Sequence, residues 1–354
     1  MILNIQTLRV FFAFLVVTAH LEPVYVALGL VDPTRTISAG ANDGFFIVSA
    51  FVIVYTSLRK PTSAAEFLGR RYARLVPFYW MITLFAALLA CVAPSLFQTT
   101  HVTAETLTKS ILFIPYYKHA HVVQPLVFVG WAMNYIVFVI AIHALMKVFA
   151  GARAWLATAG ALLTLALIGA IAQPGDVVLA FFTGPRLVAF AFGVLLAGLW
   201  HNQPLTVKRQ HSPGYRALAI GLIVGGFAVR LGQQIFFREL DMRLAAPLAS
   251  AAIVIGALLL EANGDRHRSA LRDKIAEATF SIYLTHYFVT QAVVKTLAHI
   301  AHPPTIVLIA GLVVAYAGAA VLGVLVCQYA EKPLDLWVRS VWRRWTPARQ
   351  PVEA

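Results

Sequence analysis

Long apolar runs alternate with short polar, mostly basic connections along almost the whole chain. A helix that crosses a bilayer needs about 20 predominantly apolar residues, at a rise of about 1.5 Å per residue. Such runs lie near 8–28, 41–58, 75–95, 126–148, 154–173, 177–199, 215–233, 243–262, 277–299 and 304–328. These runs lack the alternation of apolar and polar residues that is typical of transmembrane β-strands. The pattern therefore predicts an all-α polytopic membrane protein, a bundle of about ten transmembrane helices.

The composition agrees with this prediction, because 60% of the 354 residues are hydrophobic and only 12% are charged, against about a quarter charged in soluble domains. We expect one integral membrane domain over 1–335 and a short basic cytoplasmic tail over 336–354. No small-residue cleavage site follows the first run, so we interpret it as the first spanning helix and not as a signal peptide. Cys91 and Cys327 each lie inside an apolar run, which indicates neither a disulfide framework nor a metal site.

The basic residues predict an orientation. With both termini in the cytoplasm, the inner side carries 20 of the 28 lysines and arginines, namely Arg9, Arg59, Lys60, Arg70, Arg71, Arg74, Lys147, Arg153, Lys208, Arg209, Arg216, Arg266, Arg268, Arg272, Lys274, Lys332, Arg339, Arg343, Arg344 and Arg349. The positive-inside rule favours this arrangement. Because these residues are dispersed over short loops, the net charge of +13 indicates topology and attraction to lipid headgroups, and no nucleic-acid partner is expected.

The first apolar run, "LRVFFAFLVVTAH", contains Arg9 and ends at His20. Eleven residues at about 100° each place both side chains on one helix face, about 16 Å apart along the axis. Ionisable groups at such depth generally mark function. The alternative is an interfacial arginine and a histidine hydrogen-bonded within the bundle. A ligand with phosphates at one end and a reactive atom about that far away, as in coenzyme A thioesters, would match the pair.

Two further stretches carry candidate residues in the next part of the chain. In "FLGRRYARLVPFYW", Arg71 and Arg74 share a helix face and could grip phosphate with bidentate donors, although such a cluster also arises from topology alone. In "NDGFFIVSAF", Asp43 precedes a span that contains Ser49. Asp43 could orient a histidine or bind a polar substrate, or it could cap the helix.

Near the C-terminus, "FSIYLTHYF" brings Tyr283 and His286 into a span, and "YAEKPL" puts Glu331 at the end of the last one. His286 could be a hydrogen-bonded core histidine, and Glu331 could be an interfacial charge. Their functional interpretation depends on the other motifs.

Taken together and in this order, the motifs resemble those of the acyltransferase 3 family over almost the whole chain. "LRVFFAFLVVTAH" is similar to the opening Arg-x10-His helix of the family, "FFIVSAF" to its FFxxSGF, "RRYARLVPFYW" to its Arg-x-x-Arg, "SIYLTHYF" to its SYxIYLxH and "EKP" to its acidic-x-Pro. "GWAMNYIVF" is similar to the GWTLNYEMFF of members that decorate exopolysaccharides. Three positions depart from the pattern: Ala50 replaces a Gly, and Ile136 and Ala189 replace Glu. The two missing acids could alter the choice of acceptor or impair catalysis.

The resemblance implies a membrane O-acyltransferase in the bacterial inner (cytoplasmic) membrane. It would move an acyl group, usually acetyl, from cytoplasmic acyl-coenzyme A to a sugar hydroxyl of an exopolysaccharide or other cell-surface glycan, or of its lipid-linked precursor. Acetyl-CoA is then a donor substrate, and no permanently bound cofactor or metal is expected. His20 suits the general base, since the ordinary pKa of histidine is about 6.5. Asp43 or Glu331 would assist it.

The resemblance also implies the binding residues. Arg9, Arg71 and Arg74 would hold the phosphates of coenzyme A, and the acceptor would contact Trp131, Asn134, Tyr135, Ser49, Tyr283 and His286. The first three of these acceptor residues could equally belong to an interfacial aromatic belt. Two other classes of protein remain as alternatives. A transporter would more often show internal repeats or paired broken helices, and we find neither clearly. A non-catalytic scaffold or sensor gains some weight from the two missing acids.

Overall fold

The computed structural model describes residues 2–32, 41–94, 101–119, 122–202, 212–235 and 244–345. Lys208, Arg209, Arg349 and the last part of the predicted tail lie outside these ranges. The helices are α1 Leu3–Ala19, α2 Glu22–Ala27, α3 Ala41–Arg59, α4 Ala64–Val92, α5 Ala104–Ile111, α6 Trp131–Ala150, α7 Ala154–Ala172, α8 Val177–Phe182, α9 Arg186–Asn202, α10 Pro213–Ile235, α11 Ala245–Asn263, α12 Ala270–Glu277, α13 Thr279–Ala298, α14 Thr305–Val326 and α15 Lys332–Trp345.

The predicted all-α class is confirmed, apart from a small antiparallel pair formed by β1 (Tyr117–His119) and β2 (Val122–Val123). Each predicted run contains a helix. Six helical stretches of the described chain are long and apolar enough to cross a membrane, so the predicted count of ten is not confirmed: Ala64–Val92, Phe128–Ala172, Val177–Asn202, Pro213–Gln233, Ala245–Asn263 and Thr305–Trp342. Together with the family described below, these stretches indicate a membrane protein.

The first predicted run is two helices and not one. Helix α1 ends at Ala19 with His20 as its C-cap, and the short α2 begins at Glu22 with Pro23 in its first turn. Proline suits the first turn of a helix, whereas in a continuous helix Pro23 would lack the N–H for the Ala19 carbonyl and its ring would clash with that carbonyl. The His20 N–H still donates to the Val17 carbonyl at 3.1 Å. His20 thus keeps nearly helical register with Arg9, but it lies at the end of α1 and not halfway along a span.

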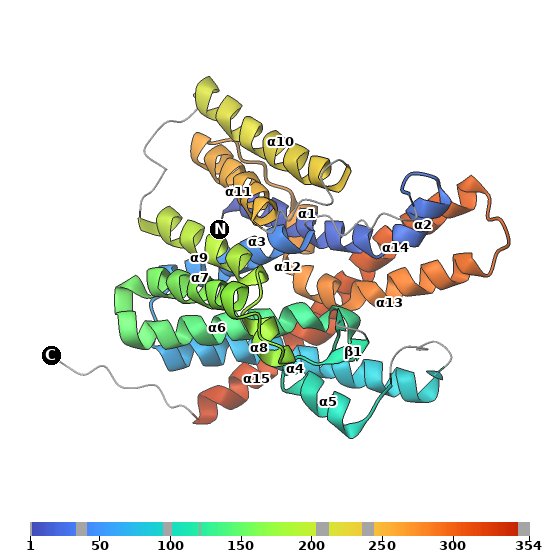
Figure 1. The fold of residues 1–354 in the computed structure, drawn as a ribbon, viewed down its shortest axis with the longest axis horizontal. Coiled ribbons are helices and arrows are strands. Elements are labelled where there is room, and N and C mark those ends of the chain that lie inside the picture. The colour runs from blue at the N-terminus through green and yellow to red at the C-terminus, as the bar shows by residue number, and fades with distance from the viewer. Residues whose placement is uncertain are drawn as a thin grey trace.

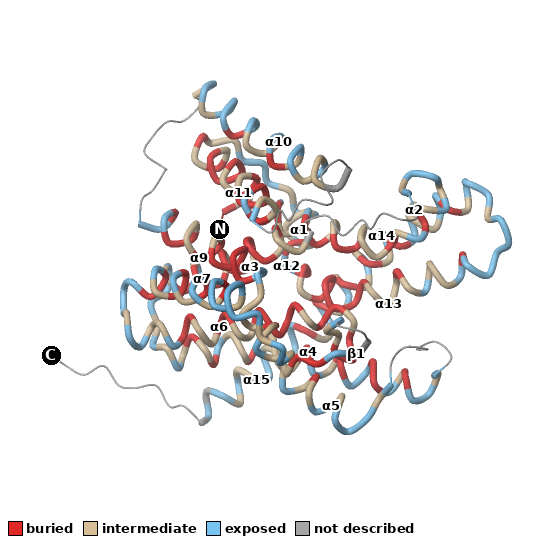
Figure 2. Tube along the Cα trace, in the orientation of Figure 1, coloured by how far each residue is buried: buried red, intermediate tan, exposed pale blue. Residues whose placement is uncertain are grey.

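The buried core is formed by facing sides of α1, α3, α4, α6, α9, α11 and α13, and the outer face of α10 is largely exposed (Figures 1 and 2). Small residues allow α3 and α9 to approach closely, because a Cβ at Gly193 of α9 would collide with the Ile47 carbonyl of α3 and lie 2.8 Å from Ala50 Cβ. Apolar membrane helices often associate through small residues of this kind. Ala50, which departs from the family pattern, therefore belongs to the α3–α9 contact.

At the other end of the chain, α15 packs along α4, where the Trp342 ring covers Gly69 and would lie 2.6 Å from a Cβ there. Helix α14 passes into α15 through a π-helical turn, η4, over Cys327–Glu331. Such turns are frequent at functional sites. The predicted tail is therefore helical from its start at 336 as far as Trp345.

Candidate donor cavity and histidine pair

A basic cavity of about 650 Å³ opens among α1, α3, α4 and α15. We call it the outer cavity. Seven basic residues contribute to its wall, and no acidic residue is among its described lining: Arg9, Arg59, Lys60, Arg70, Arg71, Arg74 and Arg339. A concave surface with charge of one sign concentrates ligands of the opposite sign. The outer cavity is therefore suited to an anion with several charges.

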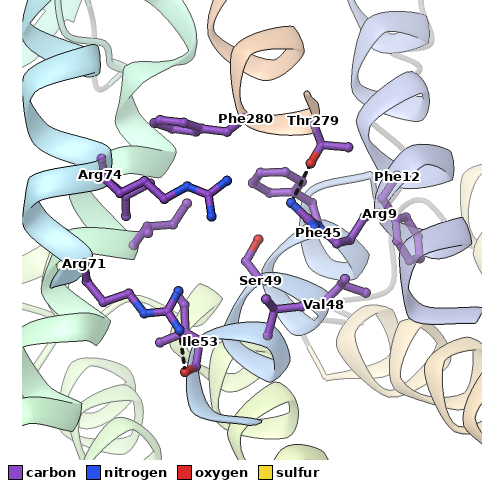
Figure 3. A pocket seen from close by; sticks show the side chains of 13 residues that line it. Arg9, Phe12, Phe45, Val48, Ser49, Ile53, Arg71, Arg74, Thr279 and Phe280 are labelled. Carbon is purple, nitrogen blue, oxygen red and sulfur yellow. Dashed lines mark hydrogen bonds between the residues drawn. The ribbon is translucent and has the colours of Figure 1, made fainter. Parts of the chain in front are cut away.

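A smaller cavity of about 110 Å³, the inner cavity (Figure 3), shares part of its wall with the outer cavity. Both cavities are lined by Arg9, Val52, Arg71 and Arg74. Beyond these residues the wall is mainly apolar, with two hydroxyl side chains: Phe12, Phe45, Val48, Ser49, Ile53, Leu75, Ile136, Thr279 and Phe280. The charged compartment thus leads into a narrow apolar one, with three arginines at the boundary.

Local contacts hold two of these arginines in place. Arg9 donates from Nη1 to Gln6 Oε1 and from Nη2 to Thr279 Oγ1, each at 2.8 Å. Arg71 donates from Nη2 to the Ile53 carbonyl at 3.1 Å and to Thr56 Oγ1. Neither forms an ion pair with a carboxylate of the described chain, although the charge of Glu331 also acts on Arg9. Both guanidinium groups can therefore bind an anionic ligand.

Arg74 is held by Glu331. Its Nη2 lies 3.5 Å from Glu331 Oε1, and Ser281 Oγ donates to Glu331 Oε2 at 2.6 Å. Glu331 is 3% exposed and lies in the π-helical turn. A buried carboxylate needs such partners, and Glu331 in turn fixes Arg74 at the cavity wall.

Two histidines from distant parts of the chain lie together at the far end of α1. The ring centroids of His20 and His286 are 5.2 Å apart. The Phe128 and Tyr287 rings stack on each other, with 4.4 Å between their centroids. Both rings lie nearly perpendicular to the His20 ring, with centroid distances of 5.2 Å from Phe128 and 5.3 Å from Tyr287. Sequence analysis proposed the two histidines separately and did not predict that they meet.

Aromatic residues separate the inner cavity from the histidine pair. Phe45, in the cavity wall, stacks on Tyr283 at 4.7 Å between centroids. The Tyr283 hydroxyl donates to the Val129 carbonyl at 2.8 Å, and its ring lies 5.9 Å from that of His286. From Phe12 in the cavity wall to His20, α1 rises by about 12 Å. His20 is therefore beyond the described cavity, along the same helix.

The two carboxylates predicted to assist His20 contact other groups. Asp43 Oδ2 lies 3.4 Å from Arg230 Nη1 on α10, and the charge of Arg186 also acts on this carboxylate. Glu331 contacts Arg74, as described above. No contact between either carboxylate and His20 occurs in the described chain, so their assistance to His20 stays a prediction.

The aromatic and amide residues predicted for the acceptor lie at the start of α6. The Arg186 guanidinium lies 5.0 Å above the Trp131 ring, and the Tyr135 hydroxyl donates to the Phe181 carbonyl at 2.8 Å. Asn134 is 2% exposed, and it lines a separate cavity of about 290 Å³. Tyr135 is enclosed by aromatic rings, so of the three only the partly buried Trp131 faces the surface to any extent.

Sequence analysis missed Thr279 and Arg230, and it assigned Arg339 to topology alone. The apolar runs give no sign of the pairing between Asp43 and Arg230. For Thr279, the only available signal is its place two residues before the "SIYLTH" motif. Of the departures from the family pattern, Ile136 lies in the wall of the inner cavity, whereas Ala189 is fully buried in the core.

The fold and the site define a helical membrane protein with a basic cavity, which leads into an apolar cavity on the side of two neighbouring histidines. Residues 2–324 match the acyltransferase domain family, so the chain belongs to this family, as its motifs predict. The exopolysaccharide production protein ExoZ of Rhizobium meliloti (strain 1021) is 31% identical over 270 residues, which cover 73% of this chain and 79% of that protein. No solved structure matches the chain.

Proposed function

We propose that the protein is a membrane O-acyltransferase that moves an acyl group, usually acetyl, from cytoplasmic acyl-CoA to a sugar hydroxyl of an exopolysaccharide or its lipid-linked precursor. Family membership supports acyl transfer, and the name of the similar ExoZ protein supports a glycan acceptor. The observation that carries the proposal is the path from a charged cavity, past three arginines, into an apolar cavity below His20.

The shape of this path suits coenzyme A. Its phosphates would lie in the outer cavity against Arg9, Arg71 and Arg74, whose planar donors match phosphate oxygens. The slender thioester arm would pass through the inner cavity toward His20, about 16 Å beyond Arg9 along α1. The arm must pass Phe45 and Tyr283, which requires their rings to move apart from the stacked arrangement.

In the proposed reaction, His20 removes the proton of the sugar hydroxyl while the hydroxyl oxygen attacks the thioester carbonyl carbon. The new C–O bond forms, the C–S bond breaks, and the thiolate of coenzyme A receives the proton from His20. A histidine suits both proton transfers, since its ordinary pKa is close to neutral pH. The acceptor would approach from the side of the membrane opposite the cytoplasm, and therefore opposite the outer cavity, near Trp131, Asn134 and Tyr135. Glu331 would act through Arg74, and Asp43, which contacts Arg230, would assist His20 through its charge and without direct contact.

The test is acyl transfer by the purified protein in proteoliposomes, with radiolabelled acetyl-CoA and glycan from a strain that lacks the protein. His20→Ala should reduce ester formation by about 10²- to 10⁴-fold, the usual contribution of a general base, while coenzyme A binding is retained. His299→Ala is the matched control, because His299 is exposed at the end of α13. Full activity of His20→Ala would refute the role of His20. Label that crosses the membrane without forming an ester would favour a transporter instead.

A further inference from the structure

The hydrogen bonds of His286 fix which of its ring nitrogens carries a proton. Its Nδ1 lies 2.7 Å from the Tyr283 carbonyl and 3.1 Å from the Ile282 carbonyl. Carbonyl oxygens only accept hydrogen bonds, so Nδ1 is the donor. In the neutral ring, Nε2 therefore carries the lone pair and can only accept a hydrogen bond.

This Nε2 atom is enclosed and unpaired. His286 is 0% exposed, and Nε2 has no hydrogen-bond partner among the described atoms. A buried polar atom without a partner costs about 1–3 kcal/mol, so the position calls for an explanation. In the observed arrangement a substrate does not supply one, because the surrounding side chains cover the atom completely.

The neighbouring side chain that can supply a partner is His20. Two imidazoles joined by a nearly linear N–H···N bond have ring centroids about 5 Å apart, given an N···N distance of about 2.9 Å. The observed separation of 5.2 Å matches this value. The rings are inclined by 39°, and no hydrogen bond joins them in this arrangement. The bond therefore requires the His20 ring to turn until one of its nitrogens points at His286 Nε2.

We propose that His286 is a positioning residue for His20, which accepts a hydrogen bond from one His20 nitrogen and leaves the other nitrogen free to take the acceptor proton. This rests on the proposed function. The bond fixes the tautomer and ring orientation of His20, and it stabilises the imidazolium that forms when His20 takes the proton. A carboxylate often has this role, but Asp43 and Glu331 contact arginines instead. A neutral ring avoids burying a further charge.

The test separates positioning from substrate binding. His286→Leu keeps much of the side-chain volume but removes the hydrogen-bond acceptor. In His286→Gln, the side-chain oxygen of the glutamine can lie near the position of Nε2 and accept a hydrogen bond. We expect His286→Leu to lower kcat by about 10- to 100-fold, the usual effect of losing a group that orients a functional residue. KM for acetyl-CoA and for the glycan should change by less than about twofold, and His286→Gln should recover part of kcat.

A double variant gives the second measurement. In a His20→Ala background, His286→Leu should cause no further loss, because the residue that it positions is absent. An unchanged kcat in His286→Leu, a raised KM for the glycan with unchanged kcat, or a full further loss in the double variant would each overturn the proposal. Retained coenzyme A binding shows that a variant is folded. If His286→Leu does not bind coenzyme A, His286→Asn is measured in its place. Full activity of His20→Ala alone would refute the proposed function and is distinguishable from these outcomes.

Discussion

Replacing Arg71 with alanine should weaken coenzyme A binding far more than the same change at Arg70, its neighbour in sequence. Arg71 lines both cavities, is held by the Ile53 carbonyl and has no carboxylate partner in the described chain. Arg70 lines only the outer cavity, is exposed and forms an ion pair with Glu66. The two substitutions remove the same charge, so they differ mainly in the position of the lost donors.

The expected magnitudes follow from this difference. A hydrogen bond to a charged group contributes about 1.5–3 kcal/mol, so the loss of Arg71 should weaken binding by about 10- to 150-fold at about 1.4 kcal/mol per factor of ten. An exposed pair contributes about 0–1 kcal/mol, which limits the effect of Arg70→Ala to about fivefold. Arg71→Lys should give an intermediate affinity, because it keeps the charge and loses the planar pair of donors.

Titration calorimetry of coenzyme A into the purified, detergent-solubilised protein measures these affinities directly. The series should be repeated at two salt concentrations, since screening weakens the exposed contacts most. Equal losses in the Arg71→Ala and Arg70→Ala variants would show that the cavity acts only through its net charge. Unchanged affinity in Arg71→Ala would remove this arginine from the donor site and leave it with a topological role.

Two other predictions concern topology and packing. For topology, cysteine is introduced at Thr108 or at Ser63 in a protein in which Cys91 is replaced by serine. The cysteine at Thr108 should react with a membrane-impermeant thiol reagent in intact cells, and the cysteine at Ser63 should react only after the membrane is opened. The reverse pattern would invert the predicted orientation. Gly193→Ala should destabilise the protein by about 1–3 kcal/mol, the usual effect of overpacking, because its Cβ would collide with α3. Gly160→Ala, with nothing within 4 Å of the added Cβ, should leave thermal unfolding in detergent unchanged or raise its midpoint by restricting the unfolded chain. Equal midpoints for the two glycine variants would contradict the packing argument.

The sequence predicted what depends on local spacing. Hydropathy located a helix in every predicted run, and the i, i+3 spacing of Arg71 and Arg74 predicts a shared helix face, from which both line the inner cavity. The break after His20 was missed because hydropathy continues across Pro23, which a count of apolar residues does not weigh. Contacts between distant segments do not follow from hydropathy or from local spacing. The pairing of His20 with His286 depends on how whole helices pack, and no single run contains that information.

The outer cavity has a consequence for the end of the proposed reaction. Its arginines would hold phosphates that acyl transfer leaves unchanged, so spent coenzyme A would bind there about as tightly as the donor. Contacts that are equal before and after the reaction lower KM without raising kcat. Product and donor would then compete for one cavity, and release of the product would limit turnover once the chemistry is fast. The rate of glycan acylation would thereby follow the cytoplasmic ratio of acyl-CoA to free coenzyme A, more than the concentration of either compound.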